Sequence, residues 1–119
     1  MKKIIAILFM GLFLSASSVF CLGPKIDKHV AVWDANTEAD LSGYYLYWRT
    51  STGSFSDTNR VMVLKSTTPR YDLLLLNLTS GTYFIAVSAY NIAGNESALS
   101  IETTWNATIP VIPKTPSIQ

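Results

Sequence analysis

Few side chains in this sequence have the type and spacing needed for catalysis. The chain has one histidine, His29, and one cysteine, Cys21. A serine–histidine or cysteine–histidine pair needs a histidine with an orienting partner, and only Asp27 and Asp34 lie near His29 in sequence. One cysteine and one histidine cannot complete a four-ligand zinc site. We therefore expect no catalytic residues and no enzyme activity.

Oxygen-bearing side chains alternate at Asp34, Asn36, Glu38 and Asp40, as ligands do in a calcium loop. Such a loop needs glycine at its sixth position, where this chain has Ala39. The same residue types are common in turns between strands, because their side chains hydrogen-bond to nearby backbone. We expect a turn here, with no metal and no cofactor.

Residues 1–21 have the layout of a secretory signal peptide. Two lysines precede an uninterrupted apolar run over residues 4–14, and small polar residues follow. This run is shorter than the roughly 20 residues that span a membrane. Cleavage after Ser18 or Cys21 predicts an exported protein, located in the periplasm, at the cell surface or outside the cell.

The alternative at this end of the chain is attachment to a membrane. A retained leader would provide it, and so would a lipid on Cys21, although Phe20 stands where a lipoprotein signal has a small residue. The formal net charge of +1 excludes a strongly basic nucleic-acid binder. The length of 119 residues suits one domain, and cleavage after Cys21 would leave it to rely on its core without disulfides.

The elements that position these residues are predicted to be strands. Turn-forming residues recur between short alternating segments, which favours an all-β sandwich, and no stretch keeps the 3.6-residue period of a helix. Strands are predicted over His29–Trp33, Gly43–Arg49, Arg60–Lys65, Tyr71–Leu76, Thr82–Asn91 and Ser97–Thr104. In residues 106–119, proline recurs at every third position from Pro110 to Pro116, which predicts an extended proline-rich tail.

Five short motifs occur in a fixed order along the chain. They are Trp33-Asp34-Ala35-Asn36, Asp40-Leu41-Ser42-Gly43-Tyr44, Leu78-Thr79-Ser80-Gly81-Thr82-Tyr83, Ala86-Val87-Ser88-Ala89-Tyr90-Asn91 and Ala93-Gly94-Asn95-Glu96-Ser97. Together they resemble a bacterial fibronectin type III domain. The resemblance implies an immunoglobulin-like sandwich of two sheets over residues 22–105. It also implies structural roles for Trp33, Tyr44, Leu46, Leu78, Tyr83, Val87 and Gly94, with Tyr83 as the tyrosine corner.

Two positions depart from the family pattern. The first strand has only residues 22–28 available, with Pro24 and three charged residues, so it should be short or missing. Ala31 stands where the family has a large aliphatic residue, so the core should be thin there unless the strand slips to use Val30 and Val32. A missing first strand would leave an edge open to pairing with another chain.

Strand alternation places Tyr45, Tyr47, Phe84 and Tyr90 on the outer side of two strands that neighbour each other in this family, with Arg49 at one end. Exposed aromatic and arginine side chains favour a binding surface, whereas cross-strand aromatic pairing would only stabilise the sheet. We expect a non-enzymatic module for protein interaction or spacing at the cell surface. The alternatives are a polysaccharide-binding accessory module and a virion or cell-surface decoration subunit.

Overall fold

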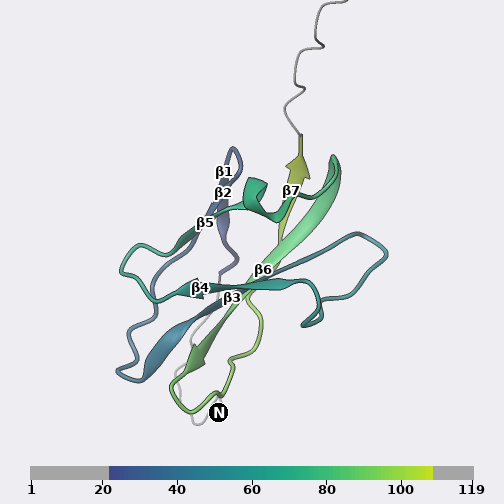
Figure 1. The fold of residues 1–119 in the computed structure, drawn as a ribbon. Coiled ribbons are helices and arrows are strands. Elements are labelled where there is room, and N and C mark those ends of the chain that lie inside the picture. The colour runs from purple at the N-terminus through teal and green to yellow at the C-terminus, as the bar shows by residue number, and fades with distance from the viewer. Residues whose placement is uncertain (1–21, 109–119) are drawn as a thin grey trace, which may run out of the picture.

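A computed structural model describes residues 22–108, which form two antiparallel sheets packed face to face (Figure 1). The three-stranded sheet has the order β1 (Lys25–Asp27), β2 (Val30–Val32), β5 (Arg70–Asp72). The four-stranded sheet has the order β4 (Arg60–Leu64), β3 (Leu41–Arg49), β6 (Gly81–Asn91), β7 (Thr103–Ala107). The predicted all-β, immunoglobulin-like sandwich is confirmed, and its first strand is short but present.

Several predictions concern residues outside the described range. The signal peptide of residues 1–21 and residues 109–119 of the tail lie there, while β7 continues to Ala107, past the expected domain end at residue 105. Among residues 22–108, no helix has the length and apolar character needed to cross a membrane.

The core lies between the sheets, where alternate side chains of β3 and β6 point toward the three-stranded sheet. Tyr44 and Leu46 on β3, and Ile85 and Val87 on β6, are buried and point toward the three-stranded sheet. The pairing of β3 with β6 shifts by one residue after Leu41. This bulge lets Leu41 point inward as well, although strict alternation would have turned it outward.

The three-stranded sheet keeps the register in which Ala31 faces the core. Ala31 is fully buried, whereas Val30 and Val32 on the opposite side are only partly covered. The strand therefore does not slip. Partly buried Ile26 and Tyr71 pack against the core on either side of Ala31, so neighbouring strands fill the space that a larger residue would occupy.

The predicted strand over Tyr71–Leu76 is wrong beyond Asp72. A 3-10 helix, η1 (Leu73–Leu76), begins there because the Asp72 carboxylate accepts a hydrogen bond from the Leu74 N–H (3.0 Å). Leu74 and Leu76 pack against the core, and Leu75 is exposed. A run of four leucines has no alternation that would have indicated which of them face solvent.

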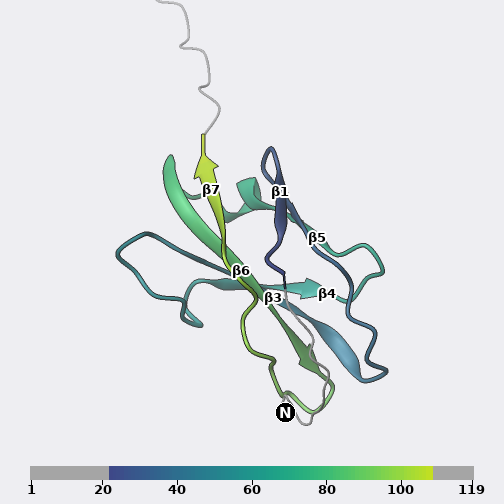
Figure 2. The same ribbon diagram turned by 180° about the vertical axis from the view of Figure 1, so that it is seen from behind.

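The predicted strand over Ser97–Thr104 is also wrong, because regular pairing begins only at Thr103. Before it, the segment Ser97–Thr103 runs beside β6 with three residues for every two of β6 (Figure 2). The Ser97 N–H donates to the Ala89 carbonyl, and the Ala89 N–H donates to the Ser97 hydroxyl (3.0 Å). Ser100 makes the same pair of bonds with Val87. We call Ser97–Thr103 the period-three segment.

Other positions singled out in the sequence have structural contacts of the expected kind. The Tyr83 hydroxyl donates to the Thr79 carbonyl (2.9 Å), which is the bond expected of a tyrosine corner. Gly94 turns the chain after β6 with a φ of 89°, a conformation that favours glycine. Leu78 packs against the core. Trp105 lies within β7, buried beside Tyr83 with ring centroids 6.0 Å apart.

Candidate functional site

The outer side of the four-stranded sheet brings together the five residues predicted to bind a ligand. Tyr45 and Tyr90 stack with ring centroids 4.6 Å apart, Tyr45 and Tyr47 meet edge to face at 6.4 Å, and the Arg49 guanidinium lies 4.5 Å from the Phe84 ring centre. We call this surface the aromatic face. The strand register accounts for it, because Arg49 is directly opposite Phe84 across β3 and β6.

Tyr45 is flanked from both neighbouring strands. Tyr90 reaches it from β6, and Arg60 reaches it from β4 with its guanidinium carbon 3.9 Å from the Tyr45 ring centre. Gly43 makes room for Tyr90, since a Cβ there would lie 2.8 Å from the Tyr90 hydroxyl and 2.9 Å from the Val63 carbonyl oxygen. Arg60 was predicted to lie in a strand but was not among the predicted site residues.

Tyr47 points outward as predicted, but it is buried, and the expectation that it is exposed is wrong. Its hydroxyl donates to the Glu96 carboxylate and accepts from Arg60 (2.9 Å). Ser88 donates to the same carboxylate (2.6 Å), and Arg60 lies 3.4 Å from it. Burial, together with the hydrogen bond to Glu96, raises the pKa of Tyr47 to about 12. Tyr47 therefore contributes hydrogen bonds to Arg60 and Glu96 instead of an exposed ring.

A second arginine covers the other end of the aromatic face. One guanidinium nitrogen of Arg49 donates to both carboxylate oxygens of Glu102, at N–O distances of 2.8 and 3.0 Å. Its guanidinium also lies 5.2 Å from the Phe55 ring centre. Each arginine thus lies over an aromatic ring and pairs with an acidic residue from the stretch after β6, Arg49 with Glu102 and Arg60 with Glu96.

Exposed apolar side chains border the aromatic face at β4. Met62 and Leu64 are 59% and 79% exposed, and they lie directly across from Tyr45 and Gly43 of β3. Ile92, just beyond β6, is 76% exposed. None of the three was among the predicted site residues. The alternation of Arg60, Met62 and Leu64 along β4 was the signal that would have placed Met62 and Leu64 on this side.

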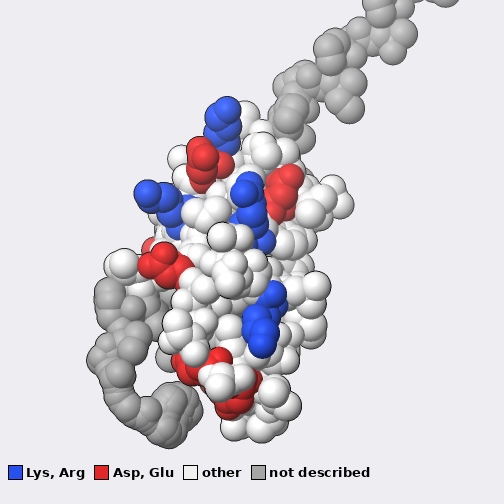
Figure 3. Space-filling model, turned by 90° about the vertical axis from the view of Figure 1, so that its left-hand side faces the viewer, with Lys and Arg blue, Asp and Glu red and all other residues white. Residues whose placement is uncertain are grey.

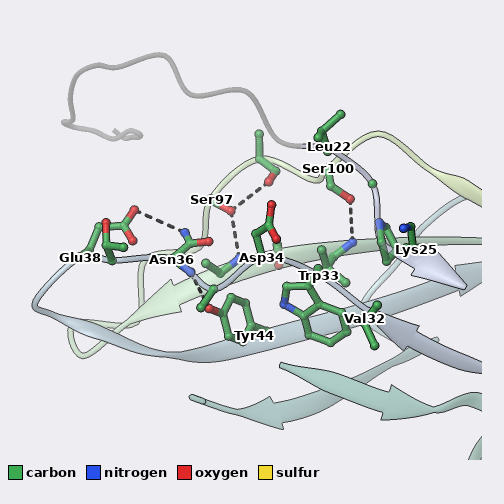
Figure 4. A pocket seen from close by; sticks show the side chains of 18 residues that line it. Leu22, Lys25, Val32, Trp33, Asp34, Asn36, Glu38, Tyr44, Ser97 and Ser100 are labelled. Atoms are coloured by element: carbon green, nitrogen blue, oxygen red, sulfur yellow. Dashed lines mark hydrogen bonds between the residues drawn. The ribbon is translucent and has the colours of Figure 1, made fainter. Parts of the chain in front are cut away.

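A cleft of about 780 Å³ opens between the sheets on another side of the molecule (Figure 4). Trp33 and Tyr44 lie in it with ring centroids 5.5 Å apart, and the indole Nε1 is buried without a hydrogen-bond partner among residues 22–108. The Asn36 N–H donates to the Tyr44 hydroxyl (2.8 Å), which fixes the loop at the cleft mouth. Burial raises the pKa of Tyr44.

The other residues considered as metal ligands or catalytic groups make contacts within the fold. Within residues 22–108, no three acidic, histidine or cysteine side chains are placed to hold a metal ion, and the Asn36 amide instead contacts Glu38 (3.4 Å). His29 Nδ1 lies 3.0 Å from the Asp72 carboxylate and links the turn before β2 to η1. The side of the molecule in Figure 3 carries acidic and basic side chains mixed together, without a patch of one sign.

Comparison with protein-family models and with curated proteins finds no match for this chain. Among solved structures, the chain is similar to the spore cortex lytic enzyme SleM of Clostridium perfringens, with 23% sequence identity and a TM-score of 0.45. The match covers 74% of this chain and 27% of that enzyme, so the chain spans about a quarter of its length.

Proposed function

We propose that the protein is an exported, non-enzymatic module of the fibronectin type III kind that binds a protein partner at the cell surface through the aromatic face. The observation that carries this proposal is a fixed, largely aromatic surface bordered by the exposed side chains of Met62 and Leu64. Aromatic and arginine residues at the centre, with exposed apolar side chains next to them, are what protein interfaces favour.

Contacts at the ring faces favour a protein over a polysaccharide. Sugar binding through aromatic residues needs ring faces left free for stacking. Here Arg60 and Tyr90 take the two sides of Tyr45, and Arg49 lies over Phe84. The apolar area left for a partner belongs instead to Met62 and Leu64, and the flexible Met62 side chain can adapt to another protein surface.

Two further features support the module type and its location. The hydrogen bond that the Tyr83 hydroxyl donates to the Thr79 carbonyl, and the turn at Gly94, agree with the motifs that resemble fibronectin type III domains. The charged and apolar layout of residues 1–21 supports export, with lipidation of Cys21 as the alternative means of attachment.

Site-specific photo-crosslinking tests this proposal. A photoreactive phenylalanine analogue is introduced at Tyr45 in one variant and at Leu75 in another, in cells that naturally make the protein. Leu75 is the control, because it is 65% exposed but belongs to η1, away from the aromatic face. We expect a discrete adduct with a second protein at position 45 and none at position 75.

The polysaccharide alternative is tested by incubating the protein with cellulose, chitin and peptidoglycan. We expect no retention on any of the three. Equal crosslinking at both positions, no adduct at position 45, or retention that Tyr45→Ser abolishes would each overturn the proposal.

A further inference from the structure

The four strands at the sheet edges differ in how open they are to pairing. β1 and β5 have three residues each, too short to offer much of a template. The edge leading into β7 is occupied by the period-three segment, where the Ser97 and Ser100 hydroxyls also donate to the carbonyls of Ala98 and Ile101. β4 has five residues in unbroken register with β3. β7 is equally long, but the Thr103 hydroxyl at its start is bonded to the Pro24 carbonyl of the segment before β1. Among the edge strands of residues 22–108, β4 is the one that also carries the exposed apolar side chains of Met62 and Leu64.

The backbone groups on the free side of β4 follow from its pairing with β3. The Trp48 N–H donates to the Asn59 carbonyl, so Asn59, Val61 and Val63 direct their backbone groups toward β3. The N–H and C=O groups of Arg60, Met62 and Leu64 therefore point away from the sheet. These are the groups that a further antiparallel strand would use.

The side chains of β4 leave this edge unprotected. β4 contains no proline and no bulge, and its only charged residue is Arg60 at the first position. The Arg60 charge is partly balanced by Glu96 of the same chain. Natural proteins usually block an edge of this kind with charge, proline or a bulge.

We propose that the protein self-associates by antiparallel pairing of β4 with β4 of a second copy, centred on Met62. This register puts Met62 opposite its own copy and Arg60 opposite Leu64 of the second copy. The two Arg60 side chains then lie at opposite ends of the seam, each beside its own Glu96, and Lys65 lies opposite Asn59. No like charges face each other, and the two four-stranded sheets become one continuous sheet.

The second copy suits this edge because its β4 supplies the same apolar pattern on the same side, and the closed two-fold arrangement uses up both free edges. A seam of five residues per chain buries much less surface than the roughly 1,200 Å² that a stable interface buries. The association should therefore be weak and depend on concentration. The inference goes beyond the proposed function and stands without it.

Disulfide trapping in the full chain tests the register. Met62→Cys is combined with Cys21→Ser, so that the new thiol is the only one. Directly opposed residues in a hydrogen-bonded antiparallel pair have Cα atoms about 5.5 Å apart, which a disulfide can bridge. Leu64→Cys in the same background is the matched control, because Leu64 is more exposed but its copy lies too far away. We expect Met62→Cys dimers to form at least about tenfold faster, through a raised effective concentration. Equal rates would overturn the proposal.

Met62→Pro tests the backbone contact independently. The Met62 N–H points away from β3, so proline there removes the intermolecular bond without removing a bond to β3. We expect sedimentation at high concentration to show dimer for the unmodified chain and only monomer for Met62→Pro. A monomeric unmodified chain, or a dimeric proline variant, would contradict the proposal. Should the proline variant fail to fold, the cysteine pair decides alone.

Discussion

Tyr47 illustrates how far a single residue can be interpreted from its position in a strand. Alternation correctly predicted that Tyr47 lies on the outer side of the sheet. It did not predict burial, because the covering groups come from elsewhere: Arg60 from the next strand and Glu96 from a stretch 49 residues further along. A side chain's direction is a local property, whereas its exposure depends on contacts that only the fold creates.

Tyr47→Phe tests the hydroxyl network through pH. The pKa of Tyr47 is raised from 10.0 to about 12, so the folded protein holds this proton more tightly than the unfolded chain. Its contribution to stability is complete below about pH 10 and is lost as the pH rises toward 12. We expect Tyr47→Phe to lower the free energy of unfolding by about 1–2 kcal/mol at neutral pH.

The same variant should lose less further stability between pH 9 and pH 11, as measured by urea denaturation at each pH. A residual slope should remain from Tyr44, whose pKa is also raised by burial. Tyr71→Phe, outside the network, is the control and should keep the slope of the unmodified protein. An unchanged slope in Tyr47→Phe would show that the network does not hold this proton.

Trp33 tests packing separately from hydrogen bonding. Its Nε1 has no partner among the described residues, so its contribution comes from contact with Tyr44 and the core. We expect Trp33→Ala to lower the free energy of unfolding by about 3–5 kcal/mol. Trp33→Phe should lose clearly less, because it keeps the ring contact and removes no bond. Urea denaturation measures both, and equal losses would indicate an unrecognised partner of the indole N–H.

At the level of the element, the long strands were predictable and the irregular segments were not. β3 and β6 are nine and eleven residues long, and their predicted positions agree with the structure to within two residues. The end of β5 is set by the Asp72 cap, and the period-three segment by serine hydroxyls that replace backbone donors and acceptors. Neither follows from alternation between polar and apolar residues.

Ser97→Ala and Ser100→Ala test the period-three segment. Each removes the hydroxyl that accepts from a β6 amide, at Ala89 and Val87 respectively. We expect each substitution to lower the free energy of unfolding by about 1–2 kcal/mol, because a partly buried donor loses its partner. Hydrogen exchange should become faster at the Ala89 amide in the first variant and at the Val87 amide in the second. Ser54→Ala, in an exposed loop, should change neither.

At the level of the whole molecule, the two sheets are joined along one side by the segment preceding β1. The Thr103 hydroxyl donates to the Pro24 carbonyl (2.5 Å), which links the start of β7 to the start of β1. Gly23 packs so closely there that a Cβ would lie 2.3 Å from the Ile101 carbonyl oxygen. The short first strand is compensated by this contact, which the composition of residues 22–28 did not indicate.

Thr103→Val tests this junction between the sheets. Valine keeps the shape of threonine but removes the bond to Pro24, so we expect a loss of about 1–2 kcal/mol in the free energy of unfolding. Thr104→Val, at the neighbouring exposed position, is the matched control and should change stability by less than about 0.5 kcal/mol. Gly23→Ala should destabilise more than either, because a backbone carbonyl must move. Thermal unfolding ranks the three, and a reversed order would argue against the junction.

The spacing of the period-three segment has a consequence for how this protein can diverge. Only every third residue is fixed by bonding to β6, so Ala98, Leu99 and Ile101 lie between anchor points and are exposed. Substitutions at these three positions leave the anchoring hydroxyls in place. Evolution, or the designer of a sequence library, can therefore vary these three side chains while the hydrogen bonds to β6 keep the period-three segment in place.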